Sequence, residues 1–204
     1  MKQSPKQTPT VFVVDDDPSI RFAMQALMDS VDLEYEIYGS ADEFLENVDE
    51  QRPGCLVLDI RMPGLGGLEL QEELIKRGNA VPIIFITGHG DVPMAVDAMQ
   101  KGAVDFIQKP FRDQDLLDRV REALSTDEER RAEQQKHAEV ADRLERLTNR
   151  EREVFDLVVT GKPNKVIAYE LGVSQRTVEI HRARVMEKMQ ARSLADLVKM
   201  HMNA

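Results

Sequence analysis

The 204-residue sequence predicts a doubly wound α/β domain followed by a small all-α domain. Short apolar runs rich in β-branched and aromatic residues alternate with stretches of helical spacing in the first part of the chain. This alternation is typical of buried parallel strands joined by helices. From about residue 147 onward the apolar residues keep helical spacing throughout. The four clearest strand segments are residues 10–14, 55–58, 83–86 and 105–108.

Helix signals lie between these strands in chain order. Asp17 and Pro18 are expected to be the N-cap and first residue of a helix, and a weaker strand over Tyr35 to Tyr38 leads into a helix from about Ser40. Further helices are expected over 68–76, from Asp91 to about 101, and from about residue 113. Five strand–helix units make a doubly wound sheet, for which strand order 2-1-3-4-5 is expected from the fold class alone.

The distribution of charge favours two domains with different partners. Residues 1–126 carry 12 Lys and Arg against 23 Asp and Glu, whereas residues 148–204 carry 10 against 7. The acidic first part and the basic last part predict a tail that meets a polyanion. We therefore expect a polar tail over 1–9, an α/β domain over 10–124, a helical linker over 125–146 and an all-α domain over 147–204.

The linker sequence leaves two interpretations open. Residues 125–146 are charged, rich in good helix formers and able to prolong the preceding helix. Val140, Leu144 and Leu147 form an apolar seam that is short for a coiled coil. The segment is either a solvated helical linker, or a lever or dimer contact that places one domain relative to the other.

The composition also indicates where the protein resides. Cys55 is the only cysteine and lies in an apolar run, so an intrachain disulfide is excluded. No segment approaches the ~20 apolar residues of a membrane span. We expect a cytoplasmic protein without a membrane partner.

Polar residues close the predicted strands and suggest one acidic pocket. The carboxyl ends of parallel strands meet at one edge of a sheet, so these residues should converge there. Crowded carboxylates need a hard divalent cation with oxygen ligands, and Mg²⁺ is the natural choice. A carboxylate beside it can attack phosphorus and hold a phosphoryl group. The residues are Asp15, Asp16, Asp59, Thr87 and Lys109.

Each pocket residue has an expected role. Asp16 and Asp59 are assigned as direct Mg²⁺ ligands, Asp15 as a ligand through water, and the main-chain carbonyl of Arg61 as a third protein oxygen. Lys109 is expected to pair with Asp59 or its phosphoryl oxygens, and the Thr87 hydroxyl to donate to a phosphoryl oxygen.

Simpler explanations exist for each residue taken alone. A strand-end aspartate is commonly a helix cap, as expected for Asp17, and a single threonine or lysine is commonly a turn hydroxyl or a surface charge. His89 is expected to be an exposed loop residue and not a phosphate carrier. The joint order of the five residues favours the pocket.

The last part of the chain predicts a helix-turn-helix. Thr148 and Glu151 form a capping box for a helix over 150–159. A second helix over 165–171, with Val166, Ile167 and Leu171 inward, is turned by Gly172. Ser174 then caps a longer helix to about Gln190.

The longer helix would enter the DNA major groove. Val178, Val185 and Met189 form its inner stripe. Glu179, Ile180 and Ala183 cluster where they could reach base edges, and the basic residues would contact phosphates. A basic helix without the glycine turn and second helix would more often be a solvated face. The complete set of expected DNA contacts is Lys165, Arg176, Thr177, Glu179, Ile180, Arg182, Ala183, Arg184 and Lys188.

The two halves resemble a known family. Residues 10–124 are similar to the receiver domain of two-component response regulators, which has a flavodoxin-like fold. Residues 147–200 resemble the LuxR-type helix-turn-helix, and the combination resembles the FixJ group. The motifs are Val13 to Asp17, Leu58 to Pro63, Thr87 to Asp91, Lys109 to Phe111, Leu147 to Glu151, Gly161 to Lys165 and Arg176 to Ala183.

The resemblance implies further roles. Asp59 would take a phosphoryl group from a sensor histidine kinase with Mg²⁺, the Lys109–Pro110 bond would be cis, and Phe106 would occupy an aromatic switch position beside Thr87. Lys165, Thr177, Arg182 and Arg184 would be backbone contacts. A fourth helix over 193–202 would dimerise.

The expected function is a phosphorylation-controlled transcriptional regulator that binds double-stranded promoter DNA as a homodimer, with RNA polymerase as a candidate partner. It would be no enzyme beyond its own phosphorylation and slow dephosphorylation at Asp59. Two alternatives stay open: an aspartyl-nucleophile phosphohydrolase, and a receiver whose tail is a protein or RNA adaptor.

Overall fold

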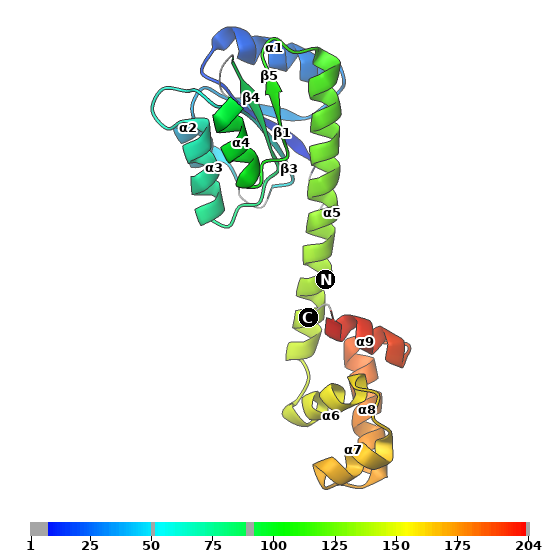
Figure 1. The fold of residues 1–204 in the computed structure, drawn as a ribbon. Coiled ribbons are helices and arrows are strands. Elements are labelled where there is room, and N and C mark those ends of the chain that lie inside the picture. Colours follow the sequence, from blue (N-terminus) through cyan, green and yellow to red (C-terminus); the bar gives the residue numbers. More distant parts are fainter. Residues whose placement is uncertain (1–7, 50–51, 89–91, 203–204) are drawn as a thin grey trace. The chain divides into compact units, whose positions relative to one another are not determined.

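The computed structural model describes residues 8–49, 52–88 and 92–202 (Figure 1). The chain divides into two compact units, residues 1–131 and 132–204. The division falls inside one long helix, α5 (Asp113–Glu145). Residues 125–146 therefore prolong the preceding helix almost to their end. The sequence-based limits of 10–124, 125–146 and 147–204 stay a prediction.

The first unit is built on a five-stranded parallel sheet in the order β2-β1-β3-β4-β5, as expected for the fold class. Central strands β1, β3 and β4 are buried on both faces because helices cover the sheet on both sides. The strands are β1 (Thr10–Val14), β2 (Tyr35–Tyr38), β3 (Gly54–Asp59), β4 (Ile83–Thr87) and β5 (Asp105–Gln108).

Two apolar layers enclose the sheet. One packs Phe12, Leu56 and Phe85 against helices α2 (Ala41–Asn47), α3 (Gly67–Lys76) and α4 (Val92–Gln100). The other packs the opposite side of the same strands against α1 (Pro18–Asp29) and α5. Successive residues of a strand point to opposite faces, so each central strand contributes to both layers. In Figure 1, α2 and α3 lie to the left of the sheet and α5 lies to its right.

Several predicted helix starts are confirmed. The Asp17 carboxylate accepts the N–H of Ser19 at 2.8 Å with Pro18 as the first helical residue, and Ser40 caps α2. The predicted start of α4 at Asp91 and the predicted exposure of His89 lie outside the described residues.

Glycine at position 67 lets the loop after β3 return to the strand end. A Cβ there would lie 2.3 Å from the Asp59 carbonyl oxygen, which no side chain tolerates. The loop consequently stays close to Asp59, and α3 begins immediately after it.

The second unit contains α6 (Asn149–Val159), α7 (Asn164–Leu171), α8 (Gln175–Met189) and α9 (Leu194–Met202). The capping box of Thr148 and Glu151 is present, and Gly172 ends α7 in the left-handed conformation with φ +64°. Ser174 accepts the N–H of Thr177 and caps α8.

The core of this unit confirms most of the predicted inner residues. Val178, Val185 and Met189 are fully buried, as is Ile167. The inward orientation predicted for Val166 is wrong, since this side chain is 39% exposed. The buried side of α7 is formed by Ile167 and Ala168, and a residue one position earlier on a helix points about 100° away.

The end of the linker belongs to this second core. Val140, Leu144 and Leu147 are buried and pack with the residues of α6 to α9. The short apolar seam in the sequence is therefore part of a domain core. Along the described ranges, no helix has the length and apolar character to cross a membrane.

Candidate functional site

Two strand-end aspartates share one lysine in the first unit. The Lys109 ammonium lies 2.9 Å from Oδ2 of Asp15 and 2.8 Å from Oδ1 of Asp59. Both carboxylates are buried, and the lysine side chain is only 24% exposed. The residues that follow β1 and β5 and the last residue of β3 are thus brought together, as predicted from their positions at strand ends.

Both oxygens of Asp59 have partners. Oδ1 accepts from Lys109, and Oδ2 accepts the main-chain N–H of Arg61 at 3.0 Å. Burial raises the pKa of Asp59, and the hydrogen bond from Lys109 offsets this only in part. Burial alone would lower the pKa of Lys109, but its bonds to Asp59 and Asp15 outweigh burial and raise it. A buried carboxylate beside an N–H and an ammonium is arranged to hold added negative charge.

Arg21 anchors this edge of the sheet and was missed in the sequence. Its guanidinium donates to the main-chain oxygen of Asp15 at 2.7 Å, and the N–H of Asp17 donates to the Asp15 carboxylate at 2.9 Å. The only sequence signal for this role is the position of Arg21, which lies one turn into α1 and therefore close to the end of β1. Asp16, which lies between Asp15 and Asp17 in the sequence, has an exposed side chain.

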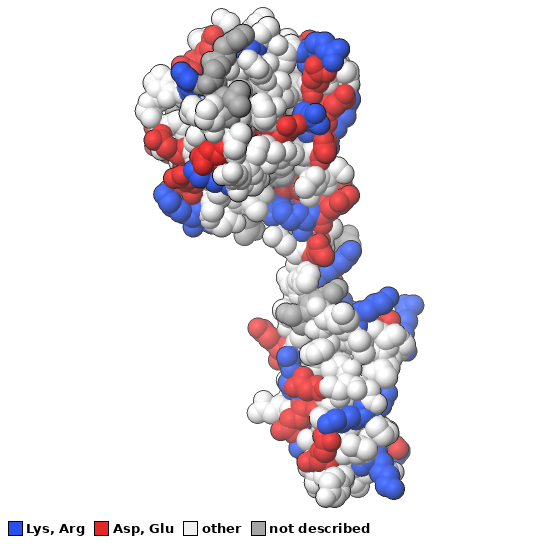
Figure 2. Space-filling view, in the orientation of Figure 1, with Lys and Arg blue, Asp and Glu red and all other residues white. Residues whose placement is uncertain are grey.

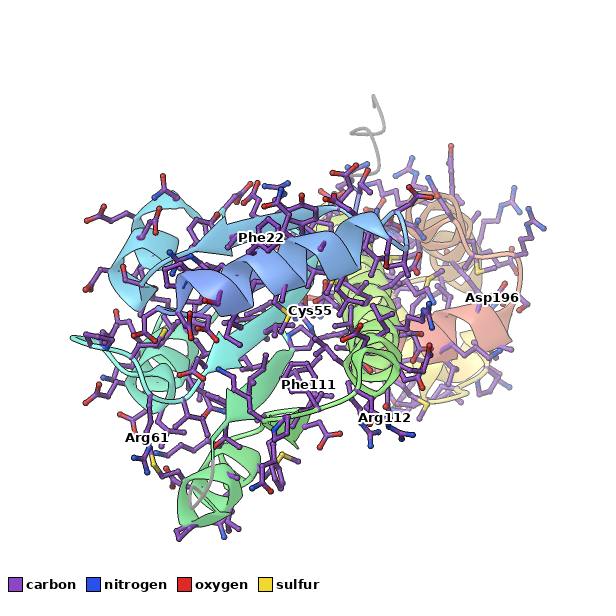
Figure 3. All side chains as sticks on the ribbon, turned by 90° about the horizontal axis from the view of Figure 1, so that it is seen from above. Phe22, Cys55, Arg61, Phe111, Arg112 and Asp196 are labelled. Atoms are coloured by element: carbon purple, nitrogen blue, oxygen red, sulfur yellow. The ribbon has the colours of Figure 1, made fainter. Side chains whose placement is uncertain are left out.

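Thr87 and Phe106 occupy the neighbouring strands. Thr87 is buried, its hydroxyl donates to the carbonyl of Gly88 at 3.3 Å, and its own carbonyl accepts the N–H of Lys109 at 2.7 Å. The Phe106 ring is 38% exposed. The Lys109–Pro110 bond is cis, as the resemblance implied. Figure 3 labels Arg61 and Phe111 on the segments that follow β3 and β5.

The donor atoms at this edge fit Mg²⁺ by type. Asp15, Asp16, Asp59 and the Arg61 carbonyl offer oxygen only, which is the ligand set that Mg²⁺ prefers. Within the described ranges, no group of three or more His, Cys, Asp or Glu side chains is placed to hold a metal ion. The Lys109 ammonium donates to both Asp15 and Asp59, and its single positive charge balances one of the two negative charges.

In the second unit, α8 presents an exposed face opposite its buried stripe. Glu179, Ile180, Ala183 and Arg184 are exposed, and the Ile180 side chain is 43% exposed. An exposed apolar side chain between polar neighbours suits contact with a thymine methyl in the major groove. Arg176 is also exposed, and Thr177 is half-buried.

Other predicted DNA contacts are engaged within the unit. The Arg182 guanidinium donates to Asn164 Oδ1 at 3.0 Å, which fixes the arginine beside the start of α7. Lys188 donates to the buried Glu151 carboxylate at 2.6 Å and to the Arg146 carbonyl at 3.1 Å. Lys188 therefore stabilises the domain core, a role that the sequence analysis did not foresee.

Charge is unevenly placed over the second unit. In Figure 2, Lys and Arg side chains lie mainly along the right edge of this unit, and Asp and Glu mainly along its left edge. Lys165, one of the predicted contacts, is exposed at the start of α7.

Two family models match the chain. "Response regulator receiver domain" matches residues 11–121, and "Bacterial regulatory proteins, luxR family" matches residues 145–201. The chain therefore belongs to the response regulators that join a receiver domain to a LuxR-type DNA-binding domain.

Named relatives cover nearly the whole chain. Nodulation protein W of Bradyrhizobium diazoefficiens is 52% identical over 93% of this chain and 84% of its own length. FixJ of Azorhizobium caulinodans is 46% identical over 93% of this chain and 90% of its own.

Solved structures agree. The structure of the response regulator StyR aligns with a TM-score of 0.89 at 45% identity, covering 97% of this chain and all of that one. Full-length FixJ from B. japonicum aligns with a TM-score of 0.61 at 39% identity, covering 97% and 98%.

These similarities establish the class of function. The chain is a transcriptional regulator controlled through phosphorylation of its receiver, and the family is not one of classical enzymes. A receiver implies a sensor kinase as partner, and the LuxR-type domain implies DNA. The phosphohydrolase and adaptor alternatives are not supported by this family.

Proposed function

We propose that Asp59 is the phosphoryl acceptor and that its modification controls DNA binding through α8. The observation that carries this proposal is the buried Asp59 carboxylate held between the Lys109 ammonium and the Arg61 N–H. The domain matches give the class of reaction, and the contacts of Asp59 support this residue as the acceptor.

The chemistry follows from the partners of Asp59. One carboxylate oxygen attacks phosphorus, a P–O bond forms, and the P–N bond of the kinase's phosphohistidine breaks with its electron pair leaving on nitrogen. Lys109 keeps its bond to Asp15 and turns its charge to a phosphoryl oxygen. Asp15, Asp16, Asp59 and the Arg61 carbonyl would hold Mg²⁺, which supplies positive charge beside the phosphoryl oxygens.

Thr87 and Phe106 would report the modification. The Thr87 hydroxyl, which donates to its neighbouring carbonyl over a long 3.3 Å, would turn to a phosphoryl oxygen. Movement of Thr87 would make space for the half-exposed Phe106 ring to turn inward. The altered α4–β5 surface would then change the pairing of chains, with α9 as the dimer contact on DNA.

DNA is proposed to bind along α8. Glu179, Ile180 and Ala183 would face base edges, and Lys165, Arg176, Thr177, Arg182 and Arg184 would contact the backbone. Lys188 would contribute through the core. RNA polymerase is a further proposed partner at promoters, and the cytoplasm, where promoter DNA lies, is the proposed location.

Acetyl phosphate with MgCl₂ tests the acceptor. Intact-protein mass spectrometry should show one added phosphoryl group on the full chain and none on Asp59→Asn. Asp16→Asn should lose most of the labelling, whereas Asp17→Asn, which keeps the helix cap, should retain it. Continued labelling of Asp59→Asn would refute the acceptor.

Footprinting on genomic DNA, followed by gel shifts at several salt concentrations, tests the interface. Arg184→Ala should weaken binding to all sequences and lower the salt dependence, because it removes a phosphate contact. Ile180→Ala should instead reduce discrimination at one base pair by about 1–3 kcal/mol. Equal effects of both variants on all sequences would contradict the base-facing role of Ile180.

A further inference from the structure

The start of β3 is bound to a buried aspartate of the linker helix. Asp127 lies on α5, is 1% exposed, and accepts the N–H of Gly54 on its Oδ2 at 3.0 Å. Gly54 is the first residue of β3. Asp127 thus satisfies a buried backbone donor at the end of a central strand.

Two arginines complete this contact. Arg131, one turn further along α5, donates from Nε to Asp127 at 2.6 Å and from a terminal nitrogen to the carbonyl of Arg52 at 2.7 Å. Arg130 also pairs with Asp127. The chain entering β3 is therefore bound at two main-chain positions. The Asp127 carboxylate binds the N–H of Gly54, and the Arg131 guanidinium, which is held by Asp127, binds the carbonyl of Arg52.

Polar contacts hold the part of α5 that lies beyond the apolar layer of the receiver unit. The residues of α5 in the apolar layer of the receiver unit end at Leu124, after Leu116, Leu117, Val120 and Ala123. Residues 125–131 continue the helix for nearly two turns as part of the same compact unit. Asp127 and Arg131 lie in these turns, so they hold a stretch that the apolar layer does not.

We propose that Asp127 and Arg131 form a latch that fixes residues 125–131 of the linker helix to the receiver and joins them to β3. Gly54 begins the strand and Asp59 ends it. A displacement of β3, if phosphorylation of Asp59 causes one, would reach the linker helix through the Gly54–Asp127 hydrogen bond. This transmitting role rests on the proposed function, whereas the latch itself stands on the contacts.

Hydrogen exchange on the unphosphorylated full chain tests the latch. In Asp127→Ala and in Arg131→Met, the amides of residues 125–131 should exchange at least about tenfold faster, since charge-assisted hydrogen bonds are lost. Asp118→Ala is the matched control, because Asp118 is an exposed aspartate on the same helix that pairs with Arg121 at 3.4 Å. Exchange in both variants at the rate of the control would overturn the latch.

The single cysteine gives a second readout next to the latch. Cys55 follows Gly54, is fully buried, and lies between the sheet and the helices α1 and α5 (Figure 3). Burial first, and the charge of Asp127 second, raise the pKa of its thiol to about 12. Labelling of Cys55 by a thiol reagent should accelerate in Arg131→Met, which keeps the Asp127 charge. An unchanged rate would count against the latch.

Gel shifts with and without acetyl phosphate test transmission. Both latch variants should take up the phosphoryl group at Asp59, yet the ratio of DNA affinities with and without phosphorylation should fall toward one. An unchanged ratio would overturn transmission through the latch. Failure of the unaltered chain to take up a phosphoryl group would instead refute the proposed function, and hydrogen exchange would still decide the latch.

Discussion

Asp59 is buried at the end of β3, and this burial makes the ionised form of its carboxyl group unfavourable in the fold. Its pKa is raised in the fold, so the folded chain binds this proton more tightly than the unfolded chain. Its contribution to stability is present below the ordinary pKa of aspartate and is lost as the pH rises through that value and then through the raised one. At neutral pH the ionised carboxylate therefore lowers the free energy of unfolding.

Asp59→Asn should accordingly be more stable than the unaltered chain at pH 7, and the difference should shrink as the pH falls through the carboxyl range. Thermal unfolding followed by circular dichroism between pH 4 and 7 would measure it. Asp118→Asn, on the exposed side of α5, should change little. Lower stability of Asp59→Asn at pH 7 would show that the Lys109 bond outweighs burial.

The pair of Glu151 and Lys188 shows the opposite balance. The hydrogen bond from Lys188, together with the N–H of Thr148, lowers the pKa of Glu151 to about 2. Glu151 therefore contributes stability above its ordinary pKa, and this is lost as the pH falls from about 4.5 to about 2.

Lys188→Met should cost about 1.5–3 kcal/mol in the free energy of unfolding of the second unit at pH 7. This loss should diminish in acid. Arg184→Met is the matched control, since Arg184 is exposed on the same helix and should affect DNA affinity but not stability. Equal stability of the two variants would mean that the bond between Lys188 and Glu151 contributes nothing to folding. Lys188 would then be a DNA contact only, as predicted from the sequence.

At the scale of the element, β3 connects the acidic site to the linker helix. It pairs with β1 and β4, ends at the acidic site and begins at the Asp127 contact. Glycine at position 54 permits the close approach of β1, because a Cβ there would lie 2.0 Å from the carbonyl oxygen of Thr10. A strand enclosed on all sides leaves little freedom for its first residue.

Gly54→Ala should therefore destabilise the receiver unit by about 3 kcal/mol through backbone displacement. Gly78→Ala is the control, because Gly78 has φ +71° but a Cβ added there would meet no atom within 4 Å, so only the conformational cost of about 1 kcal/mol applies. Urea unfolding would measure both. Similar losses at the two positions would mean that β1 shifts to make room.

At the scale of the whole molecule, the two units divide the linker helix between them. Arg131 belongs to the receiver by its bond to Arg52, while Val140 and Leu144 are buried in the second core. Arg143 also donates to the carbonyl of Met189 at the end of α8. The linker is therefore not an independent spacer over its whole length.

A fragment of residues 132–204 should be more stable than one of residues 147–204 by about 3 kcal/mol or more, because the shorter one lacks two buried apolar side chains. Chemical unfolding of both fragments would test this division. A shorter fragment of equal stability would favour the sequence-based limit at residue 147.

The strands, the helix caps, the acidic edge and the helix-turn-helix could all be predicted from the amino-acid sequence alone. These features depend on local signals: apolar periodicity, capping residues such as Asp17 and Ser174, and the rule that parallel strands end at one edge. The roles assigned to the DNA contacts and to Mg²⁺ remain predictions.

Only the tertiary structure shows which charged side chains bond within the fold and which face outward. Lys188 and Arg184 look alike in the sequence, and so do Asp127 and Asp118. Their difference lies in what each side chain meets from distant segments, such as Glu151 or the N–H of Gly54. Spacing along one helix specifies a direction around its axis, but the partner found there comes from the packing of the whole unit.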